Sequence, residues 1–184
     1  MFFSNYGCFD FSMASQILTD FLAKPQSKLN CLAFEKKLLA DSMLMKEALH
    51  LLFNGNRREQ QLVVWPIANV GVKFPELVAN YLDNLTNLFL VKGTHPAIKR
   101  NLLRIFEVSI LTERDKVKIL YECLSIISQC KEPVASIAFA ITVAKQVVDE
   151  HPELLNEFQL TIERIPKEQM TPAISVRIKR ALKK

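Results

Sequence analysis

Two pairs of proline-led segments recur in this chain at related spacings. The run Phe74–Val78 reads Phe-Pro-Glu-Leu-Val, and the run His151–Leu155 reads His-Pro-Glu-Leu-Leu 77 residues later. Between them, His95–Ile98 and Glu132–Ala135 place a second pair of prolines 37 residues apart. One unit of about 38 residues accounts for both spacings, and a period of this length is typical of arrays in which each repeat is a helix, a turn and a second helix.

The residues around each proline predict helices on local chemical grounds. Proline suits the first turn of a helix, where its missing N–H has no partner, and Ser, Thr or Asp just before a helix can accept a hydrogen bond from a free amide. Apolar residues recur at intervals of three and four between these points. The expected helices are 12–23, 27–40, 42–53, 57–72, 75–91, 96–110, 113–129, 133–148, 152–164 and 172–183.

Three details refine this prediction. The helix over 133–148 is apolar around most of its circumference, so it should lie between neighbouring helices rather than on a surface. Asn54–Asn56 and Gly93 should end helices, and Pro66 should kink the helix that contains it because it removes one backbone hydrogen bond.

Composition excludes several other classes of protein. The chain of 184 residues has only 4 glycines, too few for the many tight turns of a sandwich or barrel. Its longest uncharged run, residues 60–72, falls short of the roughly 18 residues that indicate a membrane span. The first cation is Lys24, so the N-terminus lacks the basic flank of a secretory signal. We therefore expect a cytoplasmic protein without a membrane partner.

The chain resembles the HEAT-repeat family, and among its members a group of short, uncharacterised bacterial proteins. The likeness covers roughly residues 40–184 and rests on Gln61–Pro66, Ile98–Arg104, Glu132–Ala135 and Pro152–Leu154. It implies an all-α fold of about ten helices, a right-handed α-α superhelix of the HEAT/armadillo type. We expect a single domain over 1–184: N-terminal helices over 1–56, about three helix-pair repeats over 57–164, and a C-terminal capping helix over 165–184.

Trp65 and Asn69 share a helix face one turn apart. This pair is distantly similar to a feature of the HEAT-like alkylpurine DNA glycosylases, which place an aspartate four residues after a tryptophan. Asn69 carries no charge, so the resemblance fails at the catalytic group. A structural tryptophan beside Pro66 is the favoured interpretation, and an aromatic contact from Trp65 to a partner is the alternative.

Two groups of cations are candidate contacts for a partner or for phosphate. Lys99, Arg100 and Arg104 lie near a helix N-terminus, where free amides and cations can bind anions. A structural role is favoured there, with Glu107 as a ready partner for Arg104. The second group, Arg177, Arg180 and Lys184, lies on one face of the last helix; residues 164–184 hold seven cations and one anion. A polar outer face that caps the array is weighed there against a surface for nucleic acid.

No catalytic, cofactor or metal signature is present. The four cysteines show no CxxC pair or zinc-ligand spacing, so structural thiols are expected. Phosphate-binding loops and nucleophile elbows are missing too. The sequence therefore predicts a non-enzymatic module that binds a protein or peptide, with nucleic-acid binding as the alternative; it does not indicate an oligomeric state.

Overall fold

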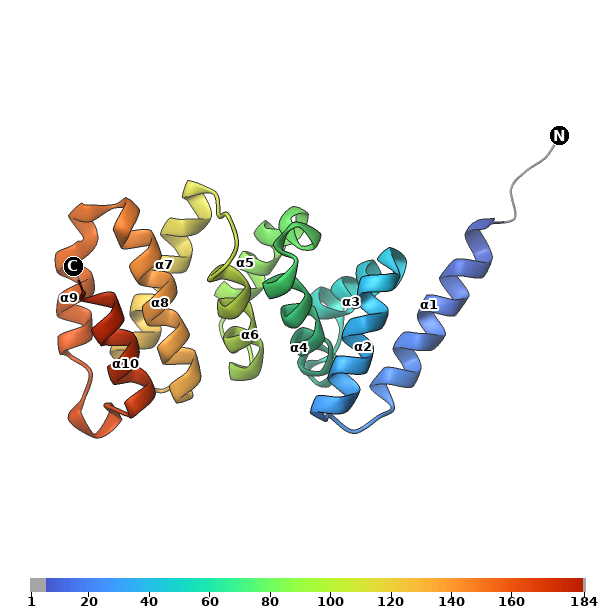
Figure 1. Ribbon diagram of the computed structural model, residues 1–184, viewed down its shortest axis with the longest axis horizontal. Coiled ribbons are helices and arrows are strands. Elements are labelled where there is room, and N and C mark those ends of the chain that lie inside the picture. The colour runs from blue at the N-terminus through green and yellow to red at the C-terminus, as the bar shows by residue number, and fades with distance from the viewer. Residues whose placement is uncertain (1–5, 184) are drawn as a thin grey trace. The chain divides into compact units, whose positions relative to one another are not determined.

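The fold is all-α in a computed structural model that describes residues 6–183, with side chains from residue 13 onward (Figure 1). The described residues form ten α-helices and no strand, which confirms the all-α expectation and its number of helices. The helices are α1 (Tyr6–Leu22), α2 (Lys28–Ala40), α3 (Ser42–Asn54), α4 (Arg57–Lys73), α5 (Leu82–Leu90), α6 (Pro96–Phe106), α7 (Glu113–Gln129), α8 (Val134–Glu150), α9 (Leu155–Glu163) and α10 (Pro172–Ala181).

Local side-chain chemistry starts most of these helices. Short polar side chains accept hydrogen bonds from the first free amides of α2, α3, α4, α7 and α10, and in α4 the Glu59 carboxylate returns the bond to complete a capping box. The capping residues are Ser27, Asp41, Asn56, Thr112 and Thr171. At α6, His95 Nδ1 accepts from the Ala97 amide ahead of Pro96. Seven of the ten expected helix starts therefore agree with the structure to within one residue, and those at residues 12, 75 and 152 do not.

The chain divides into two compact units, residues 1–77 and residues 78–184. In unit 1, α1 packs on α3 and α2 packs on α4, while α3 and α4 join the two layers. In unit 2, α5, α7 and α9 form one layer, named layer A here, and α6, α8 and α10 form layer B. The layer B helices begin at residues 96, 134 and 172, each 38 residues after the one before, as the repeat spacing predicted.

Helix α8 lies between α6 and α10 in layer B and also packs on α7 of layer A (Figure 1). Its buried residues cover most of its circumference: Ser136, Ile137, Ala138, Ala140, Ile141, Val143, Ala144, Val147 and Val148. The prediction of a helix enclosed by neighbours is therefore confirmed. Small residues such as Ala140 and Ala144 allow neighbouring helices to approach closely.

Three of the expected helices are clearly shorter in the structure. The one expected over 152–164 begins as a 3₁₀ turn, Pro152–Leu154, before α9 starts at Leu155. Residues 75–81 form two separate 3₁₀ turns, with hydrogen bonds from the Leu77 amide to the Phe74 carbonyl and from the Tyr81 amide to the Val78 carbonyl. Val78 is the one fully buried side chain of that segment, so an α-helix there would have had no apolar face to bury. Helix α6 ends at Phe106 rather than at residue 110, and Ile110 is 94% exposed.

Of the residues expected to interrupt helices, Gly93 lies after the end of a helix and Pro66 lies inside one. Gly93 adopts φ 84°, a left-handed conformation that few other residues tolerate, in the connection after α5. Helix α4 continues through Pro66, which is buried within it. At the end of α7, Cys130 takes the same left-handed conformation at φ 49°, so it caps the helix and does not share a helical face with Cys123.

Candidate binding surface

A hydrogen-bonded bridge connects α6 to α10 across layer B. Arg177 of α10 donates from Nη1 to Oε1 of Glu107 and to Oγ1 of Thr142, each at 2.8 Å. Its guanidinium carbon lies 5.2 Å from the ring centroid of Phe139. Glu107 caps the end of α6, whereas Thr142 and Phe139 belong to α8. Arg177 therefore ties all three helices of layer B together, with charge-assisted hydrogen bonds and a cation–π contact.

Replacing Arg177 with alanine should lower the free energy of unfolding by about 1–3 kcal/mol, because it leaves a half-buried carboxylate and a hydroxyl without their donor. Urea unfolding followed by circular dichroism measures this loss. The matched control is Arg180→Ala on the same helix, where the exposed side chain forms no ion pair with a described residue, and it should change stability by less than about 0.5 kcal/mol. Equal effects of the two substitutions would contradict the bridging role.

Lys99 is also engaged within the fold. Its Nζ lies 2.6 Å from Oε1 of Glu122 on α7 and 5.9 Å from the ring centroid of Phe89 on α5. The Lys99 side chain is only 11% exposed. An ammonium group held this way links layer B to layer A and offers little surface to a partner.

The other candidate cations differ in their surroundings. Arg100 and Arg180 are exposed, whereas Arg104 is half-buried and donates from Nη1 to Oδ1 of Asn101 at 2.9 Å. Glu107, which the sequence offered as a partner for Arg104, accepts a hydrogen bond from Arg177. Lys184 lies outside the described residues. Cations that the sequence placed in one group therefore have different surroundings in the structure.

Arg177 and Arg180 do come together around a small pocket. The pocket has a volume of about 150 Å³ and is lined by Thr142, Lys145, Gln146, Arg177, Arg180 and Ala181. Lys145 forms an ion pair with Asp149 one turn along α8. Gln146 donates from Nε2 to the backbone carbonyl of Glu107 at 2.9 Å. The pocket therefore offers donors to a partner, but two of its three cations already contact carboxylates.

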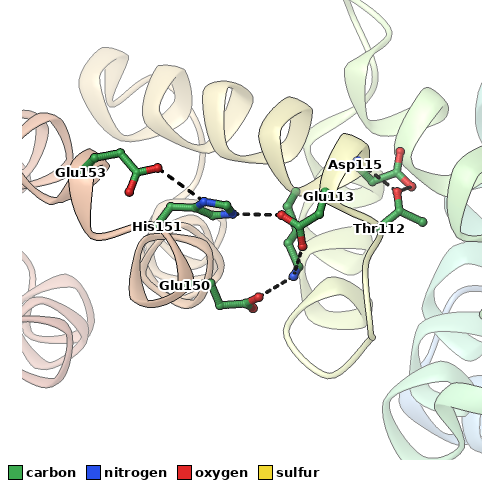
Figure 2. A network of polar contacts seen from close by, with 7 residues as sticks. Thr112, Glu113, Asp115, Glu150, His151 and Glu153 are labelled. Atoms are coloured by element: carbon green, nitrogen blue, oxygen red, sulfur yellow. Dashed lines mark hydrogen bonds and ion pairs between the residues drawn. The ribbon is translucent and has the colours of Figure 1, made fainter.

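A second polar network joins α7 to the end of α8 (Figure 2). His151 lies between two carboxylates, with Nε2 3.0 Å from Glu113 and Nδ1 3.5 Å from Glu153. Lys116 contacts both Glu113 at 2.7 Å and Glu150 at 2.5 Å. The hydrogen bond from Lys116 lowers the pKa of Glu113, and Glu113 and Glu150 together raise the pKa of Lys116. These shifts favour the charged form of both groups.

This network was not predicted from the sequence, although the repeat length could have indicated which residues pair. Glu113 and His151 are 38 residues apart, as are Glu35 and Lys73 in unit 1. Residues one repeat apart occupy matching positions on adjacent helices, so their side chains can meet. Pairing opposite charges at this separation would have found both contacts.

A groove lies next to this network, between the segment 107–111 and the C-terminal half of α8. Its volume is about 510 Å³. Phe106, Val143 and Val147 provide apolar lining and are almost completely buried. Glu107, Gln146, Asp149 and Glu150 line it with polar groups. Since Gln146 also lines the pocket of Arg177 and Arg180, the two hollows are neighbours on layer B.

In unit 1, Trp65 is half-buried and Asn69 is committed to an internal contact. Asn69 donates from Nδ2 to Oε2 of Glu35 at 2.9 Å, and Lys73 forms an ion pair with Oε1 of the same carboxylate. Glu35 is 4% exposed. The carboxylate nearest Asn69 therefore holds α2 and α4 together.

The cysteine thiols have the surroundings of structural groups. Cys31 and Cys123 are buried free thiols, and burial strongly raises the pKa of Cys123. Burial also raises the pKa of the half-buried Cys130, with the Glu168 carboxylate contributing. Raised pKa values keep thiols protonated and poorly nucleophilic at neutral pH. Among the described residues, no group of three or more His, Cys, Asp and Glu side chains could hold a metal ion.

Comparison with known proteins gives one match. A family model described as a HEAT repeat domain matches residues 18–184. No curated protein and no solved structure shows a significant match to this chain. Within residues 6–183, no helix is both long and apolar enough to cross a membrane.

Proposed function

The chain belongs to the HEAT repeat domain family, and from this membership we propose that it is a non-enzymatic interaction module that binds a protein or peptide on layer B of unit 2. HEAT repeats stack helix pairs and present an extended surface of aligned helices, which suits extended partners.

The observation that carries this proposal is the internal pairing of the cations that could have marked a nucleic-acid surface. Arg177 binds Glu107 and Thr142, and Lys99 binds Glu122. Binding to nucleic acid draws its affinity from cations that neutralise phosphates and release counterions. Cations that are already neutralised by carboxylates contribute less to this electrostatic affinity. The surface therefore favours a partner that is recognised by both apolar contacts and hydrogen bonds.

The groups that layer B leaves accessible fit such a partner. Phe139 and Thr142 are half-buried, Gln146 is exposed, and exposed Arg180 lies beside them. An aromatic ring, an amide, a hydroxyl and a guanidinium on one surface provide both apolar area and directional hydrogen bonds. Peptide segments use these contacts in grooves on helical proteins.

Nucleic-acid binding is the alternative function, and one observation favours it. Arg100, Lys179, Arg180 and Lys183 are exposed, and none of them forms an ion pair with a described residue. Together they could track a phosphate backbone weakly. This alternative predicts binding to duplex DNA that falls steeply with salt.

The experiment selects binders from a library of displayed random peptides and titrates the full chain with labelled duplex DNA at two salt concentrations. We expect selected peptides whose affinity falls at least about tenfold, equivalent to about 1.4 kcal/mol, when Gln146→Trp obstructs layer B. The matched control is Ser128→Trp, an exposed position on α7 in layer A, which should leave affinity unchanged.

Two results would refute the proposal. One is a library that yields no peptide above background. The other is micromolar, salt-sensitive DNA binding that is lost when Arg180 and Lys183, both exposed, are replaced by glutamate.

A further inference from the structure

The groove beside α8 combines an apolar lining with charged side chains. Its volume of about 510 Å³ falls in the range of natural ligand sites, about 300–1,000 Å³. Phe106, Val143 and Val147 give it an apolar lining that is 1–3% exposed, and residues 107–111 form one wall. These three side chains expose almost no surface, so the accessible apolar area of the groove comes mainly from Ile110 on the wall.

Ile110 on that wall is 94% exposed, the highest value among the exposed large hydrophobic residues. The fold gains nothing from its position, since α6 has already ended at Phe106 and α7 begins at Glu113. An isoleucine side chain beside an apolar groove can contribute burial energy only when another molecule covers it.

The ion pairs near the groove are asymmetric, with the cation covered and the carboxylate exposed. Lys116 is 14% exposed, whereas its partner Glu150 is 55% exposed. Lys145 is 22% exposed, whereas its partner Asp149 is 60% exposed. The side chains of Glu113 and Glu153 are 67% and 70% exposed, and both carboxylates contact His151 (Figure 2).

This asymmetry sets the sign of charge that a partner meets. The charged side chains that line the groove are the carboxylates of Glu107, Asp149 and Glu150 and the ammonium group of Lys116, a formal charge of −2. The cations that pair with Glu107 and Asp149, which are Arg177 and Lys145, do not line it. The whole chain, in contrast, has a net charge of +5. The groove is thus a locally acidic site on a basic protein, and it attracts positive groups.

We propose that this groove binds a peptide segment of a partner protein that places a large apolar side chain beside lysine or arginine. The inference rests on the proposed function and specifies its partner. The apolar side chain lies between Ile110, Phe106 and Val147, and the cation contacts the exposed carboxylates of Asp149 and Glu150.

The test uses three labelled synthetic peptides of equal length in fluorescence anisotropy titrations with the full chain at low salt. One alternates lysine with isoleucine, the second alternates glutamate with isoleucine, and the third alternates lysine with serine. We expect the lysine–isoleucine peptide to bind at least about tenfold more tightly than either of the others, because only it satisfies both the apolar lining and the acidic rim.

Paired variants locate the binding site. Asp149→Asn with Glu150→Gln should weaken the lysine–isoleucine peptide about tenfold, while Glu157→Gln with Glu163→Gln on α9 makes the same change in charge and should not. Ile110→Ser should weaken it by a similar factor, whereas Val117→Ser on α7 should have no effect. Circular dichroism checks that each variant is folded.

The outcomes separate this inference from the proposed function. Equal affinity for the three peptides, or wild-type affinity of the Ile110→Ser chain, overturns the groove assignment. If the displayed library selects acidic or uncharged peptides that Gln146→Trp blocks, the proposed function stands and this inference fails. If no peptide of any composition binds, both fail.

Discussion

Replacing Phe89 with alanine should lower the free energy of unfolding by about 3–5 kcal/mol, because the side chain is completely buried and its removal leaves a cavity. Phe89 projects from α5 to meet the edge of Phe106 on α6, with ring centroids 5.5 Å apart and planes at 81°. This edge-to-face geometry is the favourable arrangement for two aromatic rings. Lys99 lies 5.9 Å from the same ring centroid, so the substitution also removes a cation–π contact.

Urea unfolding of the full chain, followed by helical circular dichroism, measures this effect. The matched control is Tyr121→Ala on α7, an aromatic residue that is 60% exposed and should cost less than about 0.5 kcal/mol. A loss below about 1 kcal/mol for Phe89→Ala would show that this site relaxes around the missing ring, and would contradict the tight packing of α5 against α6.

The second large effect concerns the buried carboxylate of unit 1. Lys73→Met should lower the free energy of unfolding by about 2–3 kcal/mol, because it removes the cation that pairs with Glu35. The Glu35 carboxylate would then remain nearly excluded from water, with the hydrogen bond from Asn69 still in place. The value lies below that for a fully buried ion pair since the Lys73 side chain is 55% exposed.

A double-mutant cycle isolates this interaction. Adding Glu35→Gln to the Lys73→Met chain should recover most of the lost stability, because the amide carries no charge and can still accept the hydrogen bond from Asn69. Additive losses from the two substitutions would show that Glu35 and Lys73 do not stabilise one another. The cycle thus tests whether contacts between residues 38 positions apart hold neighbouring helices of one layer together.

These contacts bear on the proposed binding role. Helices of one layer are joined by buried or half-buried ion pairs, as between Glu35 and Lys73 on α2 and α4 and between Glu107 and Arg177 at α6 and α10. The charges in these ion pairs neutralise one another, so they hold helices together without adding net charge to the surface. The exposed carboxylates near the end of α8 define the electrostatic character of the groove instead.

Much of the fold followed from the sequence. Thr112, Thr171 and Pro96 start helices because a cap or a proline acts on amides within one turn of itself. The spacing of prolines gave the repeat length that the layer B helices show. The expected helices that begin at residue 75 and end at residue 110 are shortened where few side chains are buried: Val78 is the one buried residue of 75–81, and Ile110 is 94% exposed.

The candidate site followed from the sequence much less well. Arg177, Lys99 and Arg180 all appeared as cations on helix faces, yet Arg177 and Lys99 pair within the fold and Arg180 is exposed. The acidic groove escaped notice because its residues come from the end of α6, the start of α7 and the end of α8. No single helix carries the pattern.

The all-α class and the repeat length were thus determined by the sequence alone, because caps and prolines act within a few positions and this local pattern recurs about every 38 residues. The pairing of charges was decided by the tertiary structure. Glu107 and Arg177 are 70 residues apart, and their contact exists because α6, α8 and α10 pack side by side. Packing also covers Lys116 and exposes Glu150, so the sign of charge that a partner meets depends on which member of each pair the neighbouring helix buries.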